Sequence, residues 1–253
     1  MLGRRRKTGD GSASSRLALD DPAVQLKLDL LSRALPASDA IVFGDMWVIE
    51  GAYTQRCLEL GCERVTLVDN FETPGFVETR AANPGLNFYK GDFSDALFME
   101  SIRERYEVGV LYDILLHQPP LLHTLHLMLS KVGGRICFVQ PMLREAADDA
   151  VAVYLPGNPS AESLHPLGAE QGAISLAGAR EANPAHWIWG LTPSFMEAAL
   201  AGEGFDITHR VEIDEQRFPN PRWFWWGCIA ERTDAELQHW SRHYRERDLR
   251  TAS

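Results

Sequence analysis

Short apolar runs alternate with segments of helical periodicity from residue 20 to residue 141. An apolar run without a polar face is typical of a strand that is covered on both sides of a sheet, whereas apolar positions spaced three and four apart predict helices. The expected strands are 40–44, 64–69, 86–92, one within 107–116, and 135–141. The expected helices are 20–36, 51–61, 95–106 and 120–134.

This alternation of strands and helices predicts a doubly wound α/β sheet whose strands are mostly parallel. Residues 142–190 break the rhythm and are rich in Ala, Gly, Pro and Asn, so we expect an insertion that forms a lid over the strand ends. A helix is expected again at 192–205. The strands expected at 206–214 and 222–232 are joined by a short connection, which favours an antiparallel pair. A charged helix is expected at 234–250.

Composition places these elements in one globular domain. The chain has 253 residues, of which 45% are hydrophobic and 24% charged. We expect residues 1–18 to be a disordered basic arm and 19–253 to be the single domain. The arm lacks the apolar run of a signal peptide, and no stretch approaches the ~20 apolar residues of a membrane-spanning helix. The oligomeric state is left open.

Net charge and cysteine content indicate which classes of partner and which cellular compartment to expect. The net charge of -10 argues against a dedicated nucleic-acid binder, which needs a basic surface. Cys57, Cys62, Cys137 and Cys228 form no C-x-x-C pair, so no zinc knuckle is expected. We expect buried thiols in a chain that works in the reducing cytoplasm.

Polar residues follow the expected strands at the points where a parallel sheet places its ligand. Asp69 ends the second strand, and a carboxylate there can accept both ribose hydroxyls of a nucleoside. Asp92 ends the third strand and can accept an exocyclic amine of adenine, with Phe93 against the ring. Each acid alone is weak support, because acids at strand ends also cap helices.

Residues 38–232 resemble the class I S-adenosylmethionine-dependent methyltransferase family. The first loop of that family usually has the sequence Asp-x-Gly-x-Gly-x-Gly. Here Asp45 takes the acidic position and Gly51 the last glycine, but Trp47 and Ile49 occupy the first two glycine positions. A side chain at those positions resists the close approach of the backbone to the cofactor.

Two further segments carry the resemblance. The sequence "GDF" at 91–93 is similar to the adenine-contact turn of the family, and "YDILLHQPPLLHTLHLMLSKVGGRICFVQP" is similar to its fourth strand, following helix and fifth strand. Leu116 departs from the pattern, because many members have Glu there.

The resemblance implies a seven-stranded, mostly parallel sheet with an antiparallel last strand. It implies transfer of a methyl group from S-adenosylmethionine to a small-molecule acceptor. The residues that it assigns to the cofactor are Asp45, Gly51, Asp69, Asp92 and Phe93.

The catalytic candidates follow the fourth strand. A methyl transfer needs mainly alignment of the acceptor, although an oxygen or nitrogen acceptor can require a general base. His117 is the candidate base, and it could equally hydrogen-bond within the loop. Asp113 is a second candidate base, and it could equally tie the loop down. His123 and His126 lie three apart, but no Glu or Cys is near enough in sequence to complete a metal site, so none is expected.

Aromatic residues gather late in the chain. In a strand, Trp223 and Trp225 would point one way and Phe224 and Trp226 the other, as core on one side and helix packing on the other. Trp187 and Trp189 with the insertion could instead cover a flat or apolar acceptor.

Two alternatives to an enzyme of this kind stay open. One is a scaffold or binding protein that kept the fold and filled the cofactor position with Trp47. The other is a Rossmann protein that binds a nicotinamide or nucleotide-sugar cofactor. The antiparallel pair expected at 206–232 counts against this second alternative.

Overall fold

The main sheet of the protein has seven strands in the order β3-β2-β1-β4-β5-β9-β8. The computed structural model describes residues 21–46, 49–144, 149–155, 189–213, 218 and 220–233. Neighbours among the first five strands are parallel, and β9 is antiparallel to both β5 and β8, which confirms the predicted fold class. The strands are β1 (Asp39–Phe43), β2 (Arg64–Asp69), β3 (Leu86–Lys90), β4 (Tyr106–Tyr112), β5 (Val132–Leu143), β8 (Phe205–Ile213) and β9 (Trp223–Arg232).

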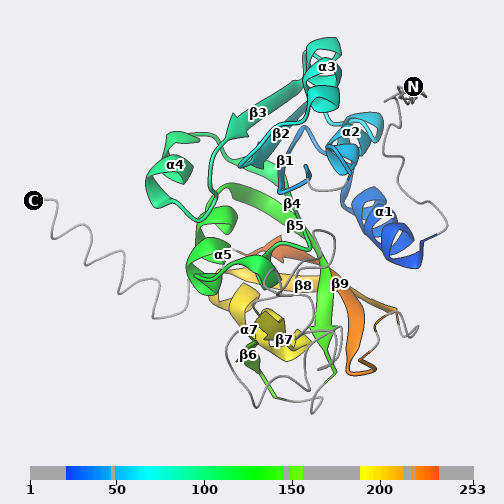
Figure 1. Cartoon of the computed structure of the whole chain (residues 1–253), viewed down its shortest axis with the longest axis vertical. Helices are drawn as coiled ribbons and strands as arrows, with labels where there is room; N and C mark the ends of the chain where they lie inside the picture. Colours follow the sequence, from blue (N-terminus) through cyan, green and yellow to red (C-terminus); the bar gives the residue numbers. More distant parts are fainter. Residues whose placement is uncertain are drawn as a thin grey trace, which may run out of the picture.

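Helices cover both faces of this sheet (Figure 1). The described helices are α1 (Pro22–Ala34), α2 (Ala52–Glu59), α3 (Pro74–Ala82), α4 (Ala96–Ser101), α5 (Leu121–Leu129) and α7 (Pro193–Gly202). The core accordingly forms two main clusters of buried side chains. One lies beneath α1, α2 and α3, and the other lies beneath α4, α5 and α7. This explains why the central strands are apolar on both faces.

Side-chain caps set where several helices begin. Asp21 precedes α1 and accepts hydrogen bonds from the N–H groups of Ala23 and Val24, as expected for a cap before a first-turn proline. Thr192 caps α7 in the same manner and accepts from the N–H of Phe195. These caps confirm the predicted starts of both helices.

The predicted helix at 120–134 is too long. Helix α5 ends at Leu129, and β5 begins at Val132. Gly133 and Gly134 therefore belong to the strand. A Cβ on Gly134 would lie 2.5 Å from the carbonyl oxygen of Glu107, so a glycine is required where β5 passes close to the start of β4.

Two helices differ from the expectation in other ways. Helix α3 was not predicted, although its start carries the same Thr-Pro sequence as α7: Thr73 caps it and Pro74 is its first residue. Helix α4 ends at Ser101, whereas the predicted helix continued to residue 106, because Tyr106 is already the first residue of β4.

The edges of the predicted insertion at 142–190 are partly described. Strand β5 continues to Leu143 within it. A two-stranded antiparallel sheet follows, formed by β6 (Ala152–Tyr154) and β7 (Trp189–Leu191). Residues 145–148 and 156–188 lie outside the described residues, as do the predicted arm at 1–18 and the predicted helix at 234–250.

The aromatic run on β9 alternates between faces as predicted. Phe224 and Trp226 pack in the cluster beneath α5 and α7. Trp225 packs against the cluster beneath α1, and the ring of Phe218 contacts both Trp225 and Trp223.

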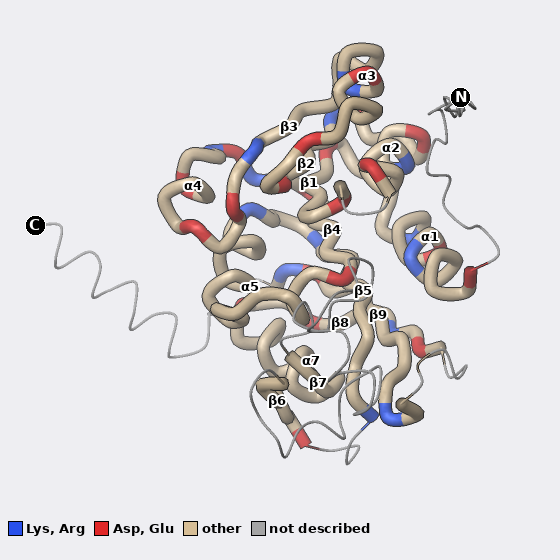
Figure 2. The backbone as a smooth tube through the Cα atoms, in the orientation of Figure 1, with Lys and Arg blue, Asp and Glu red and all other residues tan. Residues whose placement is uncertain are grey.

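The cysteines and the basic residues lie as follows in the described part of the chain. All four cysteines are buried and unpaired, which confirms the expected free thiols, while the reducing compartment itself stays a prediction. Figure 2 shows Lys and Arg residues distributed over many described helices and strands. Among the described helices, none combines the length and apolar character that a membrane crossing needs.

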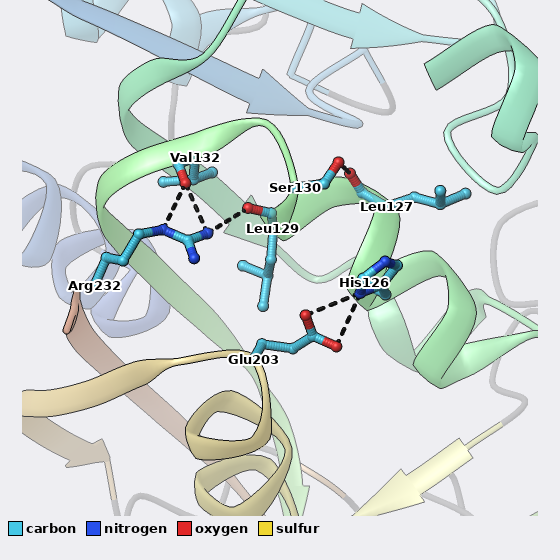
Figure 3. Close-up of polar contacts among 7 residues, drawn as sticks. All are labelled: His126, Leu127, Leu129, Ser130, Val132, Glu203 and Arg232. Atoms are coloured by element: carbon cyan, nitrogen blue, oxygen red, sulfur yellow. Dashed lines mark hydrogen bonds and ion pairs between the residues drawn. The ribbon is translucent and has the colours of Figure 1, made fainter. Parts of the chain in front are cut away.

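Arg232, at the end of β9, joins the last strand to the end of α5 (Figure 3). Its Nε and Nη2 donate to the carbonyl oxygen of Val132, at 3.0 and 2.8 Å, and Nη2 also donates to the carbonyl of Leu129 at 2.9 Å. The guanidinium lies over the ring of Phe205, 4.4 Å from its centroid. A cation at a helix C-terminus satisfies carbonyl groups that have no partner within the helix.

We expect Arg232→Met to lower the free energy of unfolding by about 1–3 kcal/mol, because the carbonyl groups at the end of α5 lose charged donors. Urea denaturation followed by circular dichroism measures this change. The matched control is Arg210→Met, which removes an ion pair to Glu197 from exposed side chains and should cost less than about 1 kcal/mol. Equal losses in the two variants would contradict the capping role.

Candidate functional site at the carboxyl ends of the parallel strands

The strand order reverses between β1 and β4, which is where a doubly wound sheet binds its ligand. The predicted site residues come from the loops that follow four strands at this edge. Asp45 and Gly51 follow β1, Asp69 ends β2, Asp92 and Phe93 follow β3, and Asp113 and His117 follow β4. The topology therefore brings the ends of all four of these strands to one edge of the sheet.

Asp45 is buried, with 3% of its surface exposed. Its Oδ2 accepts hydrogen bonds from the backbone N–H and the hydroxyl of Thr54 in α2, at 2.7 and 2.6 Å. Its Oδ1 is also buried and finds no donor among the described residues. Burial raises the pKa of Asp45 to about 7, although the donation from Thr54 lowers it in part; the nearby Asp69 raises it further.

Asp69 fixes the first loop to the end of β2. Its Oδ2 accepts from the N–H of Met46 at 2.9 Å, and its Oδ1 accepts from the N–H of Asn70 at 2.7 Å. Burial raises the pKa of this carboxyl, and the backbone N–H groups of Met46, Asn70 and Phe71 oppose the shift. Each carboxylate oxygen can accept more than one hydrogen bond, so these contacts leave room for further donors such as hydroxyls.

The first loop closes on itself at Gly51. The N–H of Gly51 donates to the carbonyl of Asp45 at 2.7 Å, and Gly51 has a left-handed φ of 82°. A Cβ there would lie 2.5 Å from the ring of Phe76 in α3. Packing against Phe76 and the backbone conformation thus both require this glycine. Trp47 lies outside the described residues, so the direction of its side chain is not part of the described site.

Asp92 and Phe93 form a turn that is held to β2. The N–H of Gly91 donates to the carbonyl of Asp69 at 2.9 Å. Asp92 is exposed, and its Oδ1 accepts from the N–H and hydroxyl of Ser94. Phe93 is largely buried, and its ring meets that of Phe43 edge-on, with centroids 6.2 Å apart. The turn therefore presents an exposed acid beside an aromatic ring that packs under the end of β1.

Asp113 follows β4 in a left-handed conformation, with a φ of 58°. Its N–H donates to the carbonyl of Val139, and its Oδ2 accepts from the ammonium of Lys27 in α1. Its Oδ1 is buried and has no donor among the described residues. Asp and Asn tolerate this backbone conformation better than most residues, which explains an acid at this position.

His117 ends a short 3₁₀ helix, η1 (Leu115–His117), and is half-buried. The preceding Leu115 and Leu116 are buried in the core, so Leu116 serves packing where the resembling family often has Glu. The indole Nε1 of Trp189 in β7 donates to the carbonyl of Gln118 at 2.8 Å. This hydrogen bond therefore ties the second sheet to the residue that follows the candidate base in the sequence.

His126 interacts with Glu203. Its Nδ1 lies 3.1 and 2.9 Å from the two carboxylate oxygens of Glu203, at the end of α7 (Figure 3). His123 is exposed on α5. Among the described residues no group of three or more His, Cys, Asp or Glu side chains has the arrangement of a metal site.

The sequence interpretation missed four residues that surround the site: Lys27, Tyr53, Thr54 and Trp225. A signal for Lys27 was present, since it falls on the apolar side of α1, four residues after Ala23 and three before Leu30, and all three side chains are buried. Thr54 and Tyr53 lie in the first turn of α2, next to the loop whose acid they contact. No sequence pattern links Trp225 to the site, because only the fold places the ammonium of Lys27 over its ring.

The residues at this edge are suited to a nucleoside with charged substituents. The two strands on either side of the switch point are each followed by an acid, Asp45 or Asp113, with one buried oxygen that has no donor among the described residues. Buried polar atoms are normally hydrogen-bonded, so each of these oxygens has the capacity to accept a further donor, from the rest of the chain or from a ligand. Asp69 and Asp92 add acceptors at the ends of β2 and β3.

Sequence comparisons find no matching family model and no matching curated protein. Solved structures do match. One is the 1,6-didemethyltoxoflavin-N1-methyltransferase of Burkholderia thailandensis with bound 1,6-didemethyltoxoflavin and S-adenosylhomocysteine, with a TM-score of 0.55 and 16% identity over 85% of this chain and 80% of that chain. The chain has the class I methyltransferase fold.

Two further structures show how widely this methyltransferase fold is used. The N-terminal domain of EvdMO1, in the presence of S-adenosylhomocysteine and D-fucose, matches with a TM-score of 0.54 and 13% identity over 85% of this chain and 84% of that chain. The [4+2]-cyclase SpnF matches with a TM-score of 0.58 and 11% identity over 89% of this chain and 84% of that chain. The fold alone therefore does not determine the reaction, which must be argued from the site.

We expect the pKa of Asp45 to make stability depend on pH. Since this pKa is about 7 in the folded chain and about 3.9 in an unfolded one, the folded state holds an extra proton between those values. The stabilisation is fully present below about pH 4 and is lost as the pH rises through 7. Asp45→Asn removes it, so the unfolding free energy of the variant relative to the parent should rise by roughly 2 kcal/mol from pH 5 to pH 8.

Urea denaturation of both proteins at each pH measures this difference. Asp206→Asn, which changes an exposed acid on β8, is the control and should show no such trend. The same difference between Asp45→Asn and the parent at both pH values would contradict the assignment.

We expect Gly51→Ala to lower the free energy of unfolding by about 1–3 kcal/mol, because the methyl group meets Phe76 and the backbone is left-handed. Thermal and urea denaturation measure the loss. Gly202→Ala in α7, where a Cβ would have no neighbour within 4 Å, is the matched control and should be neutral or slightly stabilising. A Gly51→Ala variant as stable as that control would show that the loop relaxes freely.

Proposed function

We propose that the protein transfers a methyl group from S-adenosylmethionine to a small-molecule acceptor. The observation that carries the proposal is the pair of acids, Asp45 and Asp113, that flank the switch point of a methyltransferase fold, each with a buried oxygen lacking a donor among the described residues. When bound, S-adenosylmethionine supplies a methyl group that its sulfonium already activates, so the protein has mainly to bind and align.

The residues at the strand ends divide the binding of the cofactor among them. Asp69 would accept the ribose hydroxyls while it keeps the N–H of Met46. Asp92 would accept the adenine amine, with the ring of Phe93 beside it. Asp45 and Gly51 would hold the first loop in shape, through Thr54 and the packing against Phe76. The solved structures of the same fold that contain S-adenosylhomocysteine support this cofactor.

The acceptor would be bound between η1 and the second sheet. Trp189 joins β7 to the carbonyl of Gln118, and the ring of Tyr154 lies 5.2 Å from that of Trp189, centroid to centroid. Tyr154 is 48% exposed, which leaves an aromatic surface beside Trp189. Such a surface suits a flat or apolar small molecule, and His117 would take up a proton from an oxygen or nitrogen acceptor.

A non-catalytic scaffold is the second candidate, and the hydrogen bonds of Asp69 favour it. Both oxygens of that carboxylate already accept from backbone N–H groups, and Met46 is almost completely buried. These contacts fix the described start of the loop without a ligand. Measurement of cofactor binding separates the two functions.

We expect the purified protein to bind S-adenosylhomocysteine with micromolar affinity in a calorimetric titration. Asp69→Ala should weaken binding by about tenfold or more, because a buried carboxylate that accepts two hydroxyls is lost. Asp206→Ala, an exposed acid on β8, should leave the affinity unchanged. A folded parent protein that shows no binding up to millimolar concentration would favour the scaffold.

A further inference from the structure

Strand β8 forms one edge of the main sheet. It pairs with β9 along one side, and no strand in the described part of the chain pairs with its other side. The register of the β8–β9 pair shifts between Ile207 and His209, and it is regular from His209 to Ile213. A bulge turns an edge strand away from further partners, whereas a regular edge offers N–H and C=O groups to another strand. The part from His209 to Ile213 is therefore suited to further pairing.

A groove runs between this regular part of β8 and helix α1. Its lining includes Leu26 and Leu30 of the helix and the half-buried His209, Val211 and Ile213 of the strand. The groove has a volume of about 440 Å³, which is room for several side chains of another chain. The buried Nε2 of His209 has no hydrogen-bond partner among the described residues. The free edge of β8 thus lies beside a hollow that is mainly apolar.

The charges on β8 are self-complementary about Val211. Arg210 and Glu212 flank this residue and are exposed on the opposite face of the strand. When antiparallel strands of two identical chains pair about a two-fold axis, residues equally far from the axis on either side lie opposite each other. An axis at Arg210 or at Glu212 sets like charges against each other. An axis at Val211 instead sets Arg210 opposite Glu212 of the second copy, and opposite charges stabilise a strand pair.

The lining of the groove fits the same axis. Rotation about Val211 sets His209 opposite Ile213 of the second copy and Val211 opposite itself, so the three half-buried side chains cover one another. On α1 the exposed residues along the groove include Asp29 and Arg33, one turn apart. Because this wall carries an acid and a base, two copies of it do not present a single sign of charge to each other.

We propose that the protein forms a two-fold symmetric dimer in which β8 pairs antiparallel with β8 of a second copy, centred on Val211. The main sheet then continues through both subunits, and each groove between α1 and β8 is closed by the other copy. This inference goes beyond the proposed function and does not rest on it. Strands β5 and β9 separate β8 from the switch point between β1 and β4.

Sedimentation velocity over a range of protein concentrations tests the dimer. The parent protein should dimerise with a Kd of about 10 μM or lower. Arg210→Glu and Glu212→Arg should each weaken the dimer by about tenfold or more, because the symmetry places every like-charge contact in the interface twice. Both positions are exposed, and circular dichroism checks that each variant is folded.

The double variant Arg210→Glu/Glu212→Arg should restore the parent Kd, because opposite charges face each other again. This variant still lacks the ion pair between Arg210 and Glu197, so loss of that pair cannot explain the weakening in the single variants. The matched control is Asp206→Arg, which reverses an exposed acid on β8 before the register shift and should leave the Kd unchanged.

A parent protein that stays monomeric at about 100 μM would overturn the inference, and the groove would then be open to a different partner. A dimer that both single variants leave intact, or that the double variant fails to restore, would also contradict it, since the two copies would then meet elsewhere. Titration with S-adenosylhomocysteine tests the proposed function separately, so failure of one proposal is distinguishable from failure of the other.

Discussion

Two buried carboxylates hold the loop that follows β1, and the remainder of the site depends on them. Asp45 binds the first turn of α2 through Thr54, and Asp69 binds the backbone of Met46 from the neighbouring strand. In a loop rich in glycine, the backbone itself can adopt the turns that a cofactor requires. Of the three glycines in the family pattern only Gly51 remains here, and hydrogen bonds to buried carboxylates fix the neighbouring chain instead. Burial raises the pKa of both acids, and the hydrogen bonds that they accept oppose this shift.

The same principle extends across the switch point. Asp113 after β4 is held by Lys27 just as Asp45 after β1 is held by Thr54, so each acid has one engaged oxygen and one without a donor among the described residues. Tyr53 lies between the two acids, and its ring meets that of Tyr112 edge-on at 5.0 Å. The switch point is consequently built from paired polar groups within an aromatic wall. Such a wall lowers the local dielectric constant and strengthens each hydrogen bond.

Periodicity predicted the central sheet well because its strands are covered on both faces. The runs at 40–44 and 64–69 leave no polar face, so their class as buried strands followed from the sequence, whereas the order of the strands in the sheet came only from the structure. The predicted end of α5 was wrong because two glycines were interpreted as a helix stop. The glycine at 134 is instead required by the carbonyl of Glu107, a contact that forms only in the folded chain. Helix α3 has a weak amphipathic pattern, with Phe76 as its one fully buried residue, which left little to detect.

The site was predictable where it depends on position along the chain and not where it depends on contacts between distant segments. Asp69 could be assigned from its place at a strand end, but its hydrogen bond to Met46 could not. Lys27 lies 86 residues from the acid that it pairs with, so no local pattern connects the two. The roles of the individual site residues stay predictions.

The pairing of β6 with β7 has a consequence for how this protein can change over evolution. Tyr154 and Trp189 face each other across that pair, and Trp189 is in turn fixed to the carbonyl of Gln118. The pair thereby brings together the two points of the chain between which residues 155–188 run. The entropy of closing a loop grows only with the logarithm of its length, so residues can be gained or lost there at little thermodynamic cost. That stretch can therefore change in length while the sheet and its row of acids stay unaltered.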